Sequence, residues 1–217
     1  MSTFPGSPRI LKGGIVVLEA RTGSVVRVIP LQYNPDTLSR SFQIKGVGGE
    51  SGDRIEALRL KGPPVETIKV EVEIDATDQL ETAESTVTQS GLHSILAALE
   101  TLIYPFSTTL QDNNAVAASG SIEIVAAEAD LTVFVFGPKR IAPVRITEFT
   151  ITEEAFDVSL NPIRAKLSLG MRVLTIDDVP FEERSGGLFM SYLKSKEQLA
   201  AQGKSKAFGT LGITGIP

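Results

Sequence analysis

A regular alternation of apolar and polar residues between Ile163 and Val173 constrains the fold of this chain more than any other feature. Apolar side chains occupy every second position, and Arg164, Lys166 and Arg172 lie between them. Because successive side chains of a strand point to opposite faces, a period of two predicts a strand with one buried and one exposed face. This segment is therefore expected to pack against a core.

Residues 66–76 alternate in the same way, with an acidic exposed face that includes Glu71 and Glu73. The exposed face of the later strand is basic, through Arg164 and Lys166. If the two strands are neighbours, within one subunit or between subunits, each opposite-charge pair contributes roughly 0.2–1 kcal/mol. These four residues are therefore expected to set the register of strands at a subunit interface.

Shorter extended segments and one interior helix complete the predicted β domain. Strands are expected at residues 15–18, 25–33, 38–44, 121–127, 131–136 and 141–151. Residues 91–104 carry apolar side chains at helical spacing, with Ser90 as a candidate cap and Pro105 as a stop. Residues 112–120 are small and polar, which predicts a loop. The chain is thus predicted to be mainly β with one packed helix.

The predicted organisation has three parts. Residues 1–11 form a flexible arm, residues 12–176 a β domain, and residues 177–217 an extension with a helix at about 187–200 and a Gly-rich tail. Residues 45–62 are Gly-rich and charged, which fits either a disordered loop or an ordered interface loop.

Composition argues against several classes of protein. The net charge is −5 and Lys and Arg do not cluster, so nucleic acid is not an expected partner. The chain has no Cys, which excludes disulfides and sulfur-based zinc sites. The first residues do not resemble a signal peptide, and no apolar run approaches the roughly 20 residues that span a bilayer. We therefore expect synthesis in the cytoplasm and no direct insertion into a membrane.

Residues with catalytic potential are few and scattered. His93 is the single histidine and is expected to be an exposed helix residue. Acidic clusters occur at Glu153-Glu154-Asp157 and Glu182-Glu183, where solvated strand ends and loops explain them. No catalytic residue, cofactor site or metal site is predicted, and the chain is not expected to be an enzyme.

Two sets of motifs together resemble the tube proteins of contractile injection systems, the phage-tail-like machines that drive a rigid tube through a membrane. The first is Tyr33-Asn34-Pro35, which follows the first predicted hairpin. The second combines Phe136-Gly137 with Phe156-Asp157 and Pro162-Ile163-Arg164-Ala165. The chain departs from the family pattern at Phe136, where Trp is frequent, and at Asn161, where Gly is frequent. Asn tolerates a left-handed backbone, so the turn is expected to form with Asn161 in place of Gly.

The resemblance implies a β-sandwich or barrel-like tail-tube fold of two packed antiparallel sheets, with a helix on the rim. Six such subunits join their sheets edge to edge in a ring, and rings stack into a tube. The expected role is a single ring in the baseplate hub that connects the spike to the inner tube. Its partners are copies of itself, the neighbouring tube protein, and spike or baseplate proteins in an assembled particle. Family members of this type often end in a LysM module, whose signature is absent from residues 177–217.

Two alternatives remain open. The chain could be the repeating inner-tube subunit, or a monomeric β-sandwich module that binds, for example, carbohydrate. The latter class usually displays aromatic side chains, and this chain has no Trp and three Tyr. If the chain is an assembly subunit, the loop at 45–62 is expected to bridge subunits and the tail at 203–217 to bind a partner protein. The expected interface residues are Tyr33, Asn34, Pro35, Lys45, Arg54, Glu71, Glu73, Arg164, Lys166, Phe208, Leu211 and Ile213.

Overall fold

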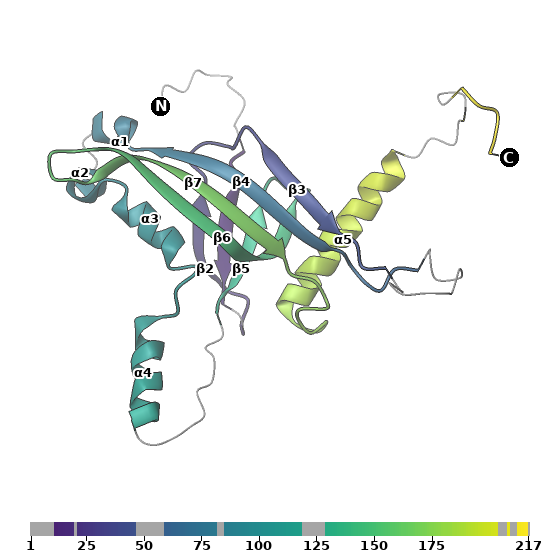
Figure 1. The fold of residues 1–217 in the computed structure, drawn as a ribbon, viewed down its shortest axis with the longest axis horizontal. Helices are drawn as coiled ribbons and strands as arrows, with labels where there is room; N and C mark the ends of the chain where they lie inside the picture. Colours follow the sequence, from purple (N-terminus) through teal and green to yellow (C-terminus); the bar gives the residue numbers. More distant parts are fainter. Residues whose placement is uncertain are drawn as a thin grey trace.

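A computed structural model describes residues 11–19, 21–46, 59–81, 85–118, 129–203, 208 and 212–216. In this part of the chain, seven strands form one open antiparallel sheet in the order β2-β1-β5-β6-β7-β4-β3 (Figure 1). The strands are β1 (Gly14–Leu18), β2 (Val25–Pro30), β3 (Leu38–Gln43), β4 (Val65–Asp75), β5 (Leu131–Val135), β6 (Ile141–Phe156) and β7 (Pro162–Val173). The helices are α1 (Thr77–Glu81), α2 (Ser85–Ser90), α3 (His93–Glu100), α4 (Ser107–Ala118) and α5 (Arg184–Gln202).

Strand β6 links two differently oriented parts of the sheet. Its first residues, 141–144, pair with β5, whereas residues 144–156 pair with β7. The register shifts between Ile146 and Glu148, and an irregularity of this kind bends a strand. Beyond the bend, the long strands β4, β6 and β7 run across the direction of β1, β2 and β5 (Figure 1).

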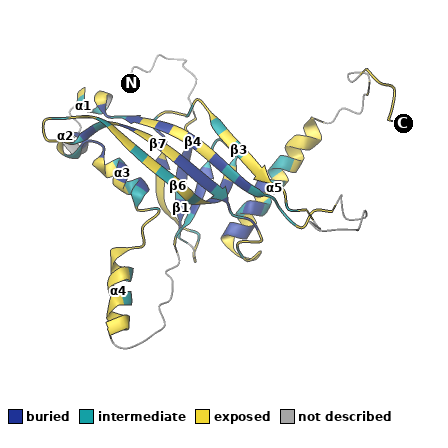
Figure 2. Cartoon of the chain, viewed as in Figure 1, coloured by how far each residue is buried: buried dark blue, intermediate teal, exposed yellow. Residues whose placement is uncertain are grey.

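A single core joins the two parts of the sheet. The alternation in β4 and β7 is confirmed, because Ile68, Val70, Leu167 and Met171 are all buried. The same cluster includes residues of β1, β2 and β5, such as Phe134, together with buried residues of α3 and α5. Figure 2 shows buried positions in dark blue along the long strands, interspersed with exposed positions in yellow. The alternating pattern therefore determined which strand faces became the core.

The prediction of a mainly β fold is confirmed, but the division into two packed sheets is not. The described strands belong to one hydrogen-bonded, open sheet. The predicted strand at 121–127 lies outside the described residues, as do residues 1–10 and most of the loop at 45–62. The described part of the chain contains no helix that is both long enough and apolar enough to cross a membrane.

One helix prediction and one loop prediction were wrong in detail. The predicted helix at 91–104 begins at His93 in α3, because the backbone of Gly91 adopts a φ of +52° and separates α2 from α3. Ser90 therefore ends α2 and does not cap α3. Residues 107–118, predicted in part as a polar loop, form α4, a helix in which no side chain is buried. The C-terminal helix is confirmed and extends slightly beyond both predicted ends.

Candidate assembly surfaces

The predicted acidic and basic strands are direct neighbours within one chain. In the β4–β7 ladder, Glu73 lies opposite Lys166 and Asp75 lies opposite Arg164. Arg164 forms an ion pair with Asp75 at 2.9 Å, and Lys166 forms one with Glu154 of β6 at 3.0 Å. The adjacency that the sequence analysis considered as a condition is therefore present inside the subunit, and a role between subunits stays a prediction.

These exposed ion pairs orient side chains and add little stability. A hydrogen bond and the negative charge of Glu154 raise the pKa of Lys166. Hydrogen bonds from the side chain and backbone of Thr77, with a smaller contribution from Arg164, lower the pKa of Asp75. Exposed pairs of this kind contribute about 0–1 kcal/mol each.

Asn34 fixes the segment that precedes β1. Its side-chain oxygen accepts a hydrogen bond from the Gly13 amide at 2.9 Å, and its side-chain nitrogen donates to the Leu11 carbonyl at 2.8 Å. Tyr33 beside it is half exposed, and residues 33–37 form one wall of a polar groove of about 800 Å³ over the outer sheet face. Glu71 and Glu73 of β4 and Lys166 of β7 also line this groove. The motif thus has a structural role through Asn34 and offers an exposed surface through Tyr33.

Two strand edges on the long part of the sheet pair with no further strand among the described residues. Strand β3 pairs with β4 on one side only. In β6, residues 145–156 pair with β7 and extend past the end of the β5 ladder. Unpaired edges present rows of N–H and C=O groups that favour pairing with another strand. The bend in β6, which creates the second free edge, was not predicted.

The turn between β6 and β7 presents apolar side chains to solvent. Val158 is fully exposed, Leu160 is 77% exposed and Phe156 is 49% exposed. The carboxylate of Asp157 accepts hydrogen bonds from the Ser159 amide at 2.7 Å, the Asn161 amide at 2.8 Å and the Asn161 side chain at 2.8 Å.

The backbone of this turn is held in an unusual conformation. Leu160 has a φ of +65°, so it occupies the left-handed position that the sequence pattern assigned to Asn161. A left-handed backbone is uncommon for a residue with a large side chain. The hydrogen bonds from Asn161 lower the pKa of Asp157 and so favour its charged form.

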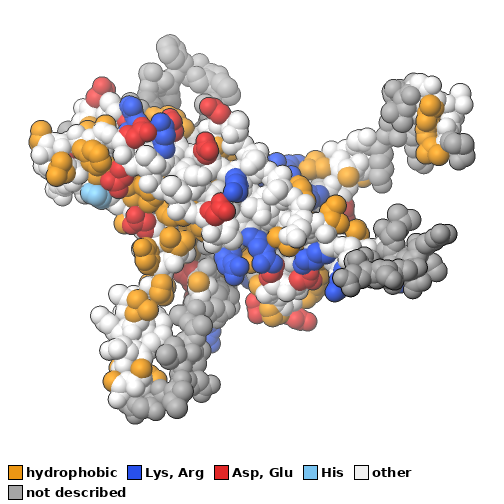
Figure 3. All heavy atoms as spheres, in the orientation of Figure 1, with side chains coloured by type: hydrophobic (Ala, Val, Ile, Leu, Met, Phe, Trp, Pro, Cys, Tyr) orange, Lys and Arg blue, Asp and Glu red, His pale blue; other side chains and the backbone are white. Residues whose placement is uncertain are grey.

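A second exposed apolar group lies at the loop end of the β3–β4 hairpin, where the chain leaves β3 and returns to β4. Ile44 is 72% exposed and Leu60 is 71% exposed. A bridge between Gly46 and Leu60 and a hydrogen bond from the Lys61 amide to the Lys45 carbonyl at 2.9 Å hold the two segments together. The exposed side chains of Arg59 and Lys61 flank Leu60, whereas Lys45 is half-buried and pairs with Asp177 at 2.8 Å. In Figure 3, hydrophobic side chains (orange) and charged side chains (blue and red) are intermixed on the visible face of the molecule.

A buried carboxylate attaches α5 to the sheet. Glu66 is 3% exposed and accepts hydrogen bonds from Arg40 at 2.7 Å, the Tyr192 hydroxyl at 2.9 Å and Lys196 at 2.7 Å. Burial alone would raise the pKa of Glu66, but these hydrogen bonds outweigh burial and lower it. Burial, together with Glu66, raises the pKa of Tyr192 to about 12. A signal for this burial is present in the alternation, because Glu66 has the same phase as the buried positions of β4.

The remaining predicted residues are dispersed. Phe208 and Ile213 of the tail are exposed, whereas Arg54 and Leu211 lie outside the described residues. His93 is exposed on α3. Within the ranges described, no three His, Cys, Asp or Glu side chains are arranged to hold a metal ion.

The sequence was also compared with known proteins. No protein-family model matches the chain, and no curated protein matches it. The fold and its surfaces are therefore the basis for a functional assignment.

Proposed function

We propose that this chain is a structural subunit of a contractile injection system that closes into a ring of six copies in the baseplate hub. The observation that carries the proposal is the pair of free edges on β3 and on residues 145–156 of β6. They bound a layer of four strands in the order β6-β7-β4-β3. The sequence motifs that resemble tube proteins support the same assignment.

The direction of the strands makes the two edges complementary. All pairs in the layer are antiparallel, so β3 and β6 run in opposite directions. When a second copy has the same orientation, its β6 edge can extend the β3 edge of the first copy in an antiparallel ladder. Such a contact joins two different surfaces, and its repetition closes a ring when the rotation between copies permits. Pairing also removes the free edges, which are otherwise an aggregation hazard.

The bend in β6 is consistent with the tail-tube fold. In orthogonal packings, a strand changes sheets through a bulge or bend, and the two parts enclose one core. Here β5 and β7 pair with different parts of β6, and both contribute to the core. On this proposal the four-stranded part forms the ring, and the part with β1, β2 and β5 supports it.

The extension beyond β7 favours a hub ring over the repeating inner-tube subunit. Helix α5 spans 19 residues and is fixed to the sheet through Glu66, so it forms an integral part of the subunit. A repeating tube subunit has little use for such an extension. On this proposal α5 and the tail contact the spike or neighbouring baseplate proteins.

The polar groove beside Tyr33 supports one alternative of another class. Tyr33 borders a groove that contains carboxylates and hydroxyl groups, including Glu71 and Thr150, and such groups suit carbohydrate binding. A monomeric binding module would need no partner at its strand edges. The mass of the chain in solution therefore separates the two functions.

The first test is the mass of the purified chain in solution, followed by negative-stain imaging of the same sample. Rings of about six copies are the expected result. A monomer that remains a monomer after co-expression with the cognate spike protein would contradict the proposal.

A disulfide cross-link then tests which edges meet. The chain has no Cys, so Ser41→Cys on β3 and Thr150→Cys on β6 introduce the only thiols. Within one chain these positions lie three strands apart and out of register, so at least about 14 Å separates them, which is too far for a disulfide. We expect oxidation of a mixture of the two single variants to give mixed dimers. The double variant should give a ladder of bands that ends at the size of the ring. Val16→Cys on the interior strand β1 is the control and should remain monomeric on denaturing gels.

A further inference from the structure

Strand β3 forms one edge of the proposed ring contact and has little burial of its own. None of its side chains is fully buried, and those of its outer face, Ser39, Ser41 and Gln43, are exposed. It pairs with β4 alone. A segment with few buried contacts opens more easily than an interior strand. The edge therefore depends on further contacts to stay extended and ready to pair.

Helix α5 supplies those contacts on the inner face of β3. Arg40 lies opposite the buried Ile68 of β4, and Phe42 points the same way because side chains alternate along a strand. The Arg40 guanidinium donates a hydrogen bond to the Tyr192 hydroxyl of α5 at 3.2 Å. It also lies over the Phe42 ring, 4.9 Å from its centre.

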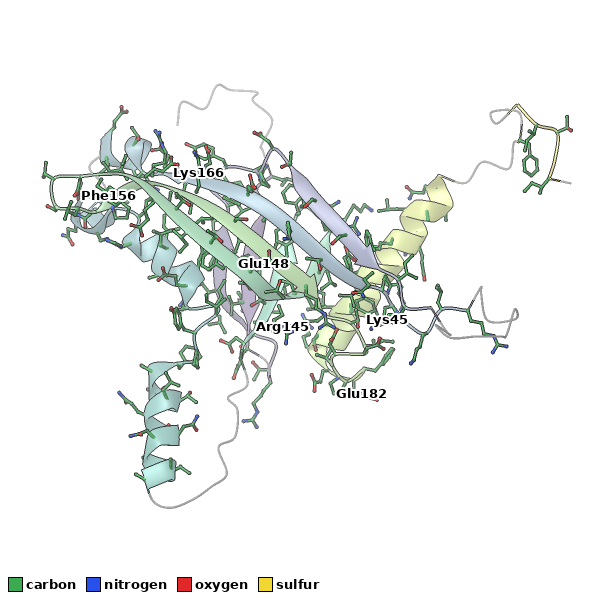
Figure 4. The ribbon with its side chains drawn as sticks, viewed as in Figure 1. Lys45, Arg145, Glu148, Phe156, Lys166 and Glu182 are labelled. Carbon is green, nitrogen blue, oxygen red and sulfur yellow. The ribbon has the colours of Figure 1, made fainter. Side chains whose placement is uncertain are left out.

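Lys196 joins the same group of side chains one turn further along α5, where it shares a helix face with Tyr192. Its ammonium lies 5.5 Å from the centre of the Phe42 ring and 4.0 Å from that of the Tyr192 ring. It also donates a hydrogen bond to Glu66 at 2.7 Å. Cations at these distances from aromatic rings are attracted to them. In Figure 4, α5 passes behind the end of β3, on the side of the molecule where Lys45 is labelled.

The contact between Phe42 and Lys196 lies at the surface. Phe42 is 47% exposed, and the side chain of Lys196 is 34% exposed. Neither residue belongs to the apolar core cluster. Loss of this contact therefore releases β3 without disturbing the core.

We infer that α5 acts as a clasp that holds β3 in the position from which its free edge can pair. We define the clasp by its residues Arg40, Phe42, Glu66, Tyr192 and Lys196. It contacts the inner face of β3 only, so the backbone edge stays open to a second copy. The inference rests on the proposed ring and adds the element that positions one of its two edges.

Hydrogen exchange tests the clasp in the single chain, at a concentration below that of ring formation. Lys196→Met removes the ammonium and keeps a side chain that favours helix. Glu66 keeps its hydrogen bonds from Arg40 and Tyr192, so the fold should persist. We expect the β3 amides that bond to β4 to exchange about tenfold faster through local opening, whereas the amides of β7 keep their rates.

A double-mutant cycle tests whether the helix and the strand act as one unit. Phe42→Leu removes the ring that Lys196 contacts and keeps an apolar side chain. Substitutions in contact with each other are not additive. We expect the acceleration of β3 exchange in the double variant to fall well short of the product of the two single effects.

Ring formation tests the consequence of the clasp, with the partner proteins present if rings need them. A smaller fraction of chains with β3 in place weakens assembly in proportion, so Lys196→Met should raise the concentration for half-assembly about tenfold by sedimentation velocity. Lys196→Arg keeps the charge and the donor and should preserve both ring formation and slow exchange. Lys194→Met, at an exposed lysine of the same helix, changes the net charge equally and should have no effect.

The outcomes separate this inference from the proposed function. Unchanged β3 exchange in Lys196→Met, equal acceleration in β3 and β7, or fully multiplicative effects in the cycle would overturn the clasp. Faster β3 exchange with unchanged ring formation would overturn its role in positioning the edge. An unmodified chain that forms no rings with or without its partners would overturn the proposed function, and the β3 exchange rates would still decide whether α5 holds the strand.

Discussion

At the scale of single residues, Glu66 shows how one buried carboxylate positions a whole helix. It lies on the core face of β4, where an unpaired charge would be strongly unfavourable. Arg40, Tyr192 and Lys196 together satisfy both of its oxygens. Because two of these partners belong to α5, the helix is held in one position on the sheet.

Replacing Glu66 should therefore have a large effect. We expect Glu66→Ala to lower the free energy of unfolding by about 3 kcal/mol, because it leaves Arg40 and Lys196 without their counter-charge. Urea denaturation followed by circular dichroism measures the change. Glu71→Ala, on the exposed face of the same strand, is the control and should stay within about 0.5 kcal/mol. Equal effects of the two substitutions would contradict the role of Glu66.

The same cluster predicts how stability depends on pH. The folded state lowers the pKa of Glu66, so its contribution is fully present above the unfolded value, about 4.3. It is lost as the pH falls through the folded pKa. The stability difference between the unmodified chain and Glu66→Gln should be constant above about pH 5 and should shrink in acid. Denaturation midpoints measured between pH 3 and pH 7 test this prediction, and a difference that grows in acid would contradict it.

Tyr192 predicts the opposite dependence at high pH. Its pKa is raised to about 12 in the folded state, so the neutral hydroxyl stabilises the fold fully below the unfolded value near 10. That contribution is lost as the pH rises through about 12. The cluster therefore holds α5 most firmly between weakly acidic and weakly alkaline pH.

At the scale of elements, Gly91 determines where the helices on the rim begin and end. Its backbone is left-handed, with a φ of +52°, and a Cβ atom there would lie 2.5 Å from the Pro162 carbonyl oxygen. The Leu92 amide donates to that same oxygen at 2.9 Å. The break between α2 and α3 is thus fixed by contact with the start of β7. Leu92 follows it and is completely buried.

Gly91→Ala should consequently destabilise the protein by about 2 kcal/mol or more, through backbone strain and the clash with β7. Thermal denaturation measures the effect. Gly187→Ala in α5 is the matched control, because no atom lies within 4 Å of the added Cβ. That change should be neutral or slightly stabilising, since Ala favours helix more than Gly does. A neutral Gly91→Ala would show that the break does not depend on this contact.

At the scale of the whole molecule, two kinds of free surface remain after the core has formed. The edges of β3 and β6 lie at the sides of the long strands, and exposed apolar residues such as Val158 and Leu60 lie near their ends. On the proposed function, the contacts at the sides generate the ring. The tail beyond α5 belongs to neither surface and is exposed where it is described.

Truncation after Gln202 should separate folding from partner binding. The described tail residues, Phe208 and residues 212–216, are exposed and contribute nothing to the core. We expect the truncated chain to keep its free energy of unfolding within about 0.5 kcal/mol and to form rings. Its binding to the cognate spike protein, measured by co-purification, should fall. Unchanged co-purification would exclude the tail from partner binding.

The sequence predicted several elements because their signals are local. The alternation in β4 and β7 follows from side-chain direction alone, and the apolar face of α5 follows from helical spacing. The pairing of β4 with β7 was suggested by their opposite charges and is confirmed by the ladder of Glu73 with Lys166. The rim helix was predicted, but its start was misplaced because Gly91 gave no local sign of its contact with Pro162.

By itself, the sequence determined which faces of β4 and β7 are buried, that the chain is mainly β, and where its C-terminal helix lies. These properties depend on periodicity within a segment of the chain. Tertiary structure alone decided that the described strands form one open sheet, that β6 leaves a free edge beyond its bend, and that α5 packs over Glu66. It also decided that exposed apolar side chains gather at the β6–β7 turn. Each of these features depends on contacts between residues far apart in the chain, and periodicity contains no information about such contacts.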